Sequence, residues 1–444
     1  MSVLEPFSQL LLTVSVVIVA CRAGAALFRR IGQPPVVGEI TVGILMGPTL
    51  LGWIWPQAQS ALFPPSVTGY VDVLGQLGLI AFMFLVGLEL DLTALRGHSR
   101  TAVTISQASI ALPLGLGALL ALAMYGDFAP DGVGRLPFTL FVAVAMSITA
   151  FPVLARVLSD CGLSDTRLGA LAMACAAVDD ATAWCLLAAV VALAGSGSAL
   201  AAASTAALTA LFLAVLFTVV RPLLARWVRH QRGGADQDGL VLTVLFAGMC
   251  LSALATDRIG VHAIFGAFVF GAITPRGHAG VERCARRLRA VALPLFVPLF
   301  FVHTGLQTDL GSLAAVPGHW WWAPAVLAVA LLGKWGGSAA AARWRGEPWK
   351  DAMSIGALMN CRGLTELVVL NIGLQLGVIE PDLFSILVLM ALTTTVLTAP
   401  VLRLLRGSPA AAAVEDALRP TVAKIPMSRR RLTAAGRAQG KPPA

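Results

Sequence analysis

Charged residues are scarce in this sequence. Asp, Glu, Lys and Arg together make up 12% of its 444 residues, against about 25% in a typical soluble domain. Hydrophobic residues make up 57%, and the mean hydropathy is +0.82. So little charge excludes an ordinary soluble protein, whereas the length allows a dozen or more membrane spans of roughly 20 residues each. We therefore predict an all-α polytopic membrane protein, because helices satisfy their backbone polar groups without water.

Motifs of enzymes and of resident metal sites are also missing. The seven cysteines are scattered singly, without C-x-x-C spacing, and are expected to be packing residues. Neither grouped His or Glu ligands nor a Ser or Cys nucleophile beside a base can be recognised. No Lys or Arg precedes the first apolar run, so we expect that run to be a helix rather than a cleaved signal. The sequence therefore predicts a protein that is not an enzyme and needs no cofactor.

Thirteen apolar runs bounded by charge clusters are predicted to span the membrane. They fall at about 8–28, 36–52, 71–88, 101–125, 136–156, 168–194, 200–220, 239–255, 260–274, 290–307, 320–342, 352–376 and 383–404. Together they form one transmembrane domain, residues 1–406. The remaining residues, 407–444, are rich in Ala, Arg and Pro and are predicted to be a disordered cytoplasmic tail.

The basic residues are distributed asymmetrically between the two sides of these spans. Of the 32 Lys and Arg residues, all but four fall on the side of the C-terminus when the loops alternate. Arg135 and Arg258 fall on the other side, and Lys334 and Arg362 lie within spans. By the positive-inside rule the C-terminus is cytoplasmic and the N-terminus is outside, in an inner or plasma membrane. The net charge of +9 therefore indicates a membrane-lipid environment and no nucleic-acid partner.

Ionisable residues within the spans mark the candidate site, because a charge at mid-membrane costs roughly 2.5–3.5 kcal/mol on insertion scales. Asp179 and Asp180 are adjacent in the middle of the sixth span, and Lys334 is central in the eleventh. A carboxylate pair satisfied by packing, or a purely structural salt bridge of Lys334, is the alternative interpretation. Arg362 and Glu366 stand one turn apart in the twelfth span, where a structural pair and direct ion handling both remain open.

Two spans carry signs of interruption. Pro152 in the fifth span removes a backbone donor and disfavours helix at Phe151, so we predict a break near Thr149 to Phe151, with a plain kink as the alternative. The twelfth span is interrupted at Asn360 to Gly363. These spans are seven apart and so run in opposite directions, which is typical of an inverted-repeat transporter with its site at the midplane.

Four motifs, in order, carry a family resemblance: Met146–Arg156, the acidic pair, Lys334 and Met359–Leu367. They resemble the monovalent cation:proton antiporters of the sodium/hydrogen exchanger superfamily, particularly the Kef-like and plant cation/proton exchanger branch. The resemblance covers about residues 8–405. It departs from the pattern at Asp179, where plant exchangers usually have Asn.

The resemblance implies two inverted six-helix repeats with crossed discontinuous helices 5 and 12. It implies a core of helices at about 101–194 and 320–404, a linker helix at about 200–220, and a scaffold at about 8–88 and 239–307 that forms a homodimer. It also implies that Asp180 is the essential cation and proton carrier.

The residues predict an exchange mechanism. Two carboxylates in a poorly solvated cavity hold protons strongly enough for a proton to compete with a cation. We expect Lys334 to pair with Asp179 in the empty site, a Na⁺ or K⁺ ion to bind at Asp180 and Asp179 as the only metal, and Thr149 to supply a neutral oxygen. Transport would be electrogenic. Supporting roles are expected for Ser147, Asn360, Arg362 and Glu366. An organic-anion or bile-acid-type symporter is the alternative transporter, and a channel is disfavoured because no repeated filter motif occurs.

The charge asymmetry generates a topology prediction. A reporter fused to the C-terminus should be active in its cytoplasmic form and inactive in its periplasmic form, because the basic loops are retained inside. Paired fusions of a cytoplasmic and a periplasmic reporter measure this directly. Activity of the periplasmic reporter alone would reverse the orientation.

Overall fold

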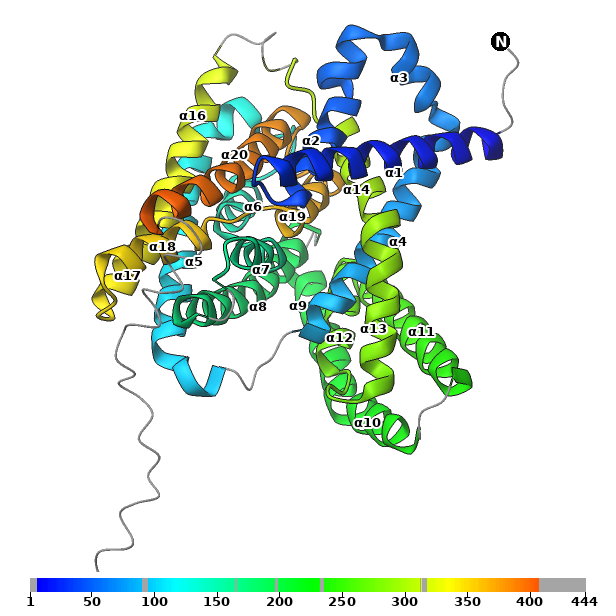
Figure 1. Cartoon of the computed structure of the whole chain (residues 1–444). Coiled ribbons are helices and arrows are strands. Elements are labelled where there is room, and N and C mark those ends of the chain that lie inside the picture. Colours follow the sequence, from blue (N-terminus) through cyan, green and yellow to red (C-terminus); the bar gives the residue numbers. More distant parts are fainter. Residues whose placement is uncertain are drawn as a thin grey trace, which may run out of the picture.

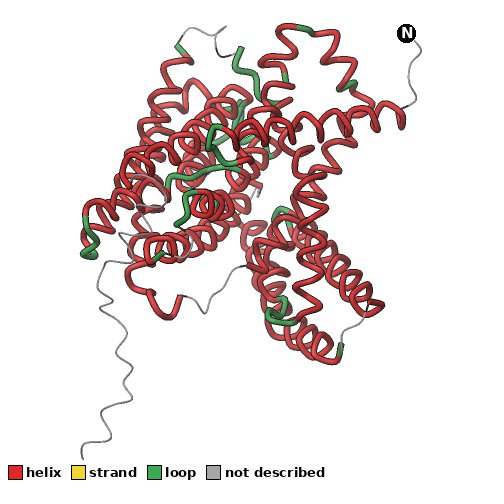
Figure 2. Tube along the Cα trace, in the orientation of Figure 1, coloured by secondary structure: helices red, strands yellow, loops and turns green. Residues whose placement is uncertain are grey.

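The structure, a computed structural model, is a bundle of helices (Figures 1 and 2). It describes residues 6–89, 95–163, 166–195, 199–231, 235–311, 313 and 318–406. All regular structure within these ranges is helical, which confirms the predicted all-α class. The predicted disordered tail, 407–444, lies outside the described residues.

One set of helices, which we call the α4 bundle, packs around α4. It contains α1 (Pro6–Arg30), α2 (Pro35–Met46) with the π-helical turn η1 (Pro48–Gly52), the short α3 (Pro56–Leu62), α4 (Pro65–Glu89), α11 (Ala235–Ile259), α12 (Ala263–Ile273), and α13 (Ala279–Val291), which continues through η3 (Ala292–Phe296) into α14 (Val297–Leu306). Helices α2 and α14 approach at two glycines, where a methyl group on Gly305 would collide with the carbonyl oxygen of Gly43. Small residues permit this close approach of two spans.

A second set, the α5 bundle, packs around α5 and α8. It contains α5 (Leu95–Phe128), α6 (Arg135–Ser147), α7 (Phe151–Asp160), α8 (Arg167–Gly195), α16 (His319–Ala330), which continues through η4 (Leu331–Gly336) into α17 (Gly337–Trp344), α18 (Trp349–Met359), α19 (Leu364–Gln375) and α20 (Pro381–Arg406). A continuous helix of α9 (Ala199–Val215), η2 (Leu216–Val220) and α10 (Arg221–His230) follows α8 and contacts both α8 and α11.

Each of the thirteen predicted runs lies mostly on helix, but not every run is long enough to count as a separate span. Within the described residues, eleven helical segments are long and apolar enough to cross a membrane, and the bent pair α18 and α19 makes up to twelve. The ninth run forms α12, whose 11 residues extend only about 16 Å against the roughly 30 Å of a hydrocarbon core. Thirteen spans and the inverted repeat therefore stay predictions.

Basic segments that the sequence indicated as loops are helical. Arg221, Arg226 and Arg229 lie on α10, and four arginines of the predicted loop at 276–289 lie on α13. Both helices are amphipathic and join the next or previous apolar helix through a π-helical turn. Arg is a good helix former, so a charged flank prolongs a helix beyond the apolar run instead of ending it.

Both predicted interruptions are present, and they meet. The fifth span is α6, an extended segment Ile148–Ala150, and α7, while α18 and α19 are separated by Asn360–Gly363 and bent by 42°. The Ala150 N–H donates to the Cys361 carbonyl over 2.9 Å, so the two unwound segments cross. Pro152 lies in the first turn of α7, where its missing N–H costs nothing. Phe151 is thus helical, and proline begins α7 rather than unwinding it.

Candidate functional site

The acidic pair lies in the middle of α8, and both side chains are buried. Asp179 is 0% exposed and Asp180 is 2% exposed. Because adjacent helical residues point about 100° apart, the two carboxylates face different neighbours. Asp179 faces Lys334 and the broken α6–α7 segment, whereas Asp180 faces the tryptophan one turn further along α8, Trp184.

Lys334 lies in the π-helical turn η4 and reaches the break in the fifth span. Its Nζ donates to Asp179 Oδ2 over 3.0 Å, to the Ser109 carbonyl of α5 over 3.2 Å, and to the Ser147 carbonyl. These three bonds use all the protons of the ammonium group. The side chain is fully buried, and the extra residue of a π-turn is a frequent feature of functional sites. The structure therefore contains the expected Lys334–Asp179 pair.

Thr149 connects the acidic pair to the second broken helix. Its hydroxyl lies within hydrogen-bond distance of Asp179 Oδ2 and, at 3.0 Å, of the Met359 carbonyl at the end of α18. A hydroxyl has one proton to donate, so it serves one of these acceptors at a time. Asn360, the next residue, has a buried side-chain oxygen without a hydrogen-bond partner among the described residues. Thr149, Asn360 and Asp179 thus bring oxygen atoms to the crossing.

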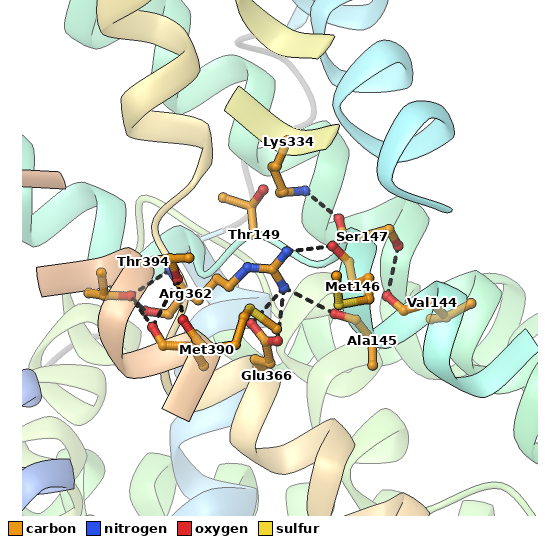
Figure 3. A network of polar contacts seen from close by, with 12 residues as sticks. Val144, Ala145, Met146, Ser147, Thr149, Lys334, Arg362, Glu366, Met390 and Thr394 are labelled. Atoms are coloured by element: carbon orange, nitrogen blue, oxygen red, sulfur yellow. Dashed lines mark hydrogen bonds and ion pairs between the residues drawn. The ribbon is translucent and has the colours of Figure 1, made fainter. Parts of the chain in front are cut away.

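Arg362 and Glu366 form a buried ion pair, and Arg362 also caps the C-terminal end of α6 (Figure 3). Arg362 Nη1 donates to both Glu366 oxygens at 2.8 and 2.9 Å and to the Ala145 carbonyl at 3.2 Å, and Nη2 donates to the Met146 carbonyl at 2.5 Å. These carbonyls lost their helical partners at the break, and a cation at a helix C-terminus is favourable. The two charges thus neutralise each other, and the supporting role of the pair stays a prediction. Ser147 likewise turns its hydroxyl to its own helix, donating to the Val144 carbonyl over 2.8 Å.

Asp180 lies where the two bundles meet. Its Oδ1 and the Trp184 indole nitrogen are both buried without a hydrogen-bond partner among the described residues. Two aromatic rings of α12, in the α4 bundle, pack on the Trp184 ring: Phe265 at 5.4 Å between centroids and Phe268 at 6.2 Å. Among the described residues no ion pair joins the Asp180 carboxylate, and the aromatic side chains of α12 pack against its neighbour Trp184.

Charge counting identifies Asp180 as the uncompensated group. Five ionisable side chains are buried here at 2% exposure or less: Asp179, Asp180, Lys334, Arg362 and Glu366. Lys334 pairs with Asp179 and Arg362 with Glu366. With all five ionised, the cluster carries one negative charge, on Asp180. A single monovalent cation or a single proton restores neutrality, which removes the cost of an unpaired buried charge.

Sequence reasoning missed three residues near the crossing. Ser109 accepts from Lys334 through its main-chain oxygen, which any residue could supply, so that contact has no sequence signal. Trp184 was indistinguishable from an interfacial or packing tryptophan. Glu39 was detectable, because it is an acid inside the second apolar run, and the structure shows it 8% exposed in α2. No group of three His, Cys, Asp or Glu side chains suited to a resident metal occurs within the described ranges.

Comparison with known proteins shows the family of the chain. The family described as "Sodium/hydrogen exchanger, transmembrane" matches residues 14–405. The Na(+)/H(+) antiporter NhaS4 of Synechocystis is 39% identical over 404 residues, covering 90% of this chain and 98% of the relative. Cation/H(+) antiporter 20 of Arabidopsis thaliana is 38% identical (89% and 48% covered), and K(+)/H(+) antiporter 1 of Saccharomyces cerevisiae is 32% identical (90% and 46% covered).

The chain therefore spans nearly all of the cyanobacterial relative but about half the length of the plant and yeast relatives. Among solved structures, the sodium proton antiporter MjNhaP1 from Methanocaldococcus jannaschii at pH 8 superimposes with a TM-score of 0.65 over 93% of this chain and 99% of that one. At 13% identity this likeness shows the fold alone.

The Arg362–Glu366 pair generates a stability prediction. Arg362→Met should destabilise the protein by about 3–5 kcal/mol, because it leaves Glu366 charged and buried without a partner. Adding Glu366→Gln should recover a large part of that loss. Thermal unfolding in detergent measures both, with exposed Arg345→Met as the matched control. If the double variant unfolds as early as the single one, loss of the carbonyl contacts at the end of α6, rather than the stranded charge, causes the instability.

Proposed function

Since the chain belongs to the sodium/hydrogen exchanger family, a family of transporters, we propose that it exchanges a monovalent alkali cation for protons across a membrane. The observation that carries this proposal is the single uncompensated carboxylate, Asp180, beside the Lys334–Asp179 pair at the crossing of two broken helices. Relatives named for sodium and for potassium exchange both match the chain, so the proposal covers Na⁺ and K⁺. The organic-anion or bile-acid symporter alternative has no support among them.

The cation and the proton compete for the same site. A dehydrated alkali ion needs several oxygen ligands, because it loses its water shell on entry. Asp180 and Asp179 would supply charge, and Thr149 and main-chain carbonyls at the breaks would supply neutral oxygens. When the cation leaves, a proton on Asp180 restores neutrality. While the Lys334–Asp179 pair stays intact, the cation-bound and the protonated forms are both neutral, and the empty form is opposed by the cost of an unpaired charge in the membrane.

Lys334 is proposed to make the exchange electrogenic. A cation that takes Asp179 as a ligand displaces the ammonium group from Oδ2, and Lys334 then gives up its proton because its counterion is occupied. A full cycle moves two protons against one cation. If instead the Lys334–Asp179 pair stays intact throughout, exchange is one for one.

The proposal extends to the motion and the assembly. Rigid movement of the α5 bundle, as the core, against the α4 bundle, as the scaffold, would expose the site to alternate sides. The division is supported by the packing of each bundle around its own helices. The family resemblance supports a homodimer formed through the scaffold, and the charge asymmetry supports a cytoplasmic C-terminus in an inner or plasma membrane.

The function itself is tested in everted vesicles with an imposed pH gradient, by adding each alkali cation and following dissipation of the gradient. The wild type should respond to Na⁺, K⁺ or both. Asp180→Asn should abolish the response while keeping side-chain volume, membrane insertion and dimerisation. Glu380→Gln, an amide substitution at an exposed position, is the matched control and should exchange normally. Exchange by Asp180→Asn at the wild-type rate would move the carrier role to another residue.

Electrogenicity is tested with reconstituted liposomes whose potential is clamped with K⁺ and valinomycin, with Na⁺ as the assayed cation. A potential of 100 mV is worth about 2.3 kcal/mol for each elementary charge moved, so it should change the exchange rate severalfold. Replacing Lys334 with a neutral residue should weaken this dependence. A rate independent of potential means one-for-one exchange, and Lys334–Asp179 is then a structural salt bridge.

A further inference from the structure

A cavity of about 490 Å³ opens between the two bundles. It lies on the side where the turn between α1 and α2 meets the C-terminal end of α20. There Arg403 of α20 donates to the Gly32 carbonyl of that turn over 2.7 Å. Its inner wall includes Pro152 and Leu364, in the first turns of α7 and α19. These residues directly follow the two breaks, so the cavity leads from this side toward the candidate site.

The charges that line this cavity are mostly positive. Three exposed arginines, Arg22, Arg29 and Arg156, line it, and Glu39 is the one carboxylate among its lining residues. Glu39 lies deeper, in α2, with a side chain 11% exposed, whereas the Arg22 side chain is 61% exposed. A cation that enters here meets an unfavourable potential from the arginines, which one inward carboxylate partly offsets.

The contact between Glu39 and Arg22 is loose. Arg22 Nη1 lies 4.0 Å from Glu39 Oε1, at the outer limit of an ion pair, and no side-chain hydrogen bond joins them among the described residues. Other ion pairs of the protein are closer: Arg283 Nε lies 2.8 Å from Asp238, and Arg167 Nη2 lies 2.6 Å from Glu347. A nearly buried carboxylate with so loose a partner is a costly structural element, and it keeps its oxygens available to an entering cation.

We propose that Glu39 is a vestibule site for the transported cation, which sets the apparent affinity for that cation on the side of the C-terminus. This inference rests on the proposed exchange function and adds a second, transient cation site to it. Glu39 attracts the cation past the arginines, and Arg22 opposes it through both repulsion and competition for the carboxylate. The site is accessible from one side only, so its effects on affinity are sided.

The expected change in apparent KM follows from the Coulomb interaction between one charge and the cation in a hydrated cavity. One charge at about 6–10 Å changes the local cation concentration by roughly two- to fivefold at physiological salt. Glu39→Gln should therefore raise the apparent KM for the cation on the C-terminal side by about that factor. Arg22→Gln and Arg29→Gln should lower it, and the pair Glu39→Gln with Arg22→Gln should return it near the wild-type value. The maximal rate and the apparent KM from the opposite side should change little.

The experiment measures Na⁺ and K⁺ dependence of proton exchange in everted and in right-side-out vesicles that contain the full chain. Glu380→Gln is the matched control, because Glu380 precedes α20 and lies at the end opposite to Arg403. Opposite, sided shifts in apparent KM for the carboxylate and arginine variants establish the vestibule site. If Glu39→Gln does not insert, Arg29→Gln still tests whether removing a positive charge from the cavity lowers the apparent KM. Arg29 lines the cavity without an ion pair to Glu39.

Two results would overturn the inference while the exchange function stands. Active variants with unchanged KM on both sides would make Glu39 a structural partner of Arg22. Equal shifts on both sides would mean that the substitutions perturb the central site rather than a vestibule. Failure of the wild type to exchange any alkali cation would instead overturn the proposed function, and the variants would have nothing to modulate.

Discussion

Charge balance inside the membrane is the constraint on which the rest of this structure depends. A buried charge without a partner costs several kcal/mol, so each of the five ionisable groups at the crossing has to be explained by a counterion or by a substrate. Lys334 and Arg362 account for two of the three carboxylates. In the proposed mechanism the third carboxylate is left to the transported ion, so a deficit of one positive charge would distinguish the cluster from a closed salt-bridge network.

The broken helices make this balance possible. An intact helix would satisfy the carbonyls of Ala145, Met146 and Ser147 internally, and they would then be unavailable to Arg362 and Lys334. The breaks therefore supply carbonyl acceptors that stabilise two basic side chains in the centre of the α5 bundle. In the α4 bundle, glycine contacts such as Gly43–Gly305 hold the helices together by close backbone packing, without polar side chains.

The sequence was sufficient to predict the features that are unfavourable inside a membrane and therefore rare there. Acids and bases within apolar runs, and proline or glycine interruptions, are exceptions to a strong rule, so Asp179, Lys334 and both breaks could be predicted. The sequence was insufficient where the active atoms are main-chain carbonyls, as at Ser109, because these are invisible in residue identity. It also failed where helix continues past the apolar run, as in α10 and α13.

The single proton of the Thr149 hydroxyl has a mechanical consequence. When Asp179 is ionised, that proton is drawn to the carboxylate, and the Met359 carbonyl at the end of α18 loses a donor. When Asp179 is neutral, the hydroxyl is free to turn toward Met359 and add a second tie beside the Ala150–Cys361 bond. The stiffness of the joint between the two half-helices is then a function of the electrical state of the site. In the proposed exchange, a cation that takes Asp179 as a ligand would also free the hydroxyl to turn toward Met359, so binding would strengthen the tie between the two broken helices.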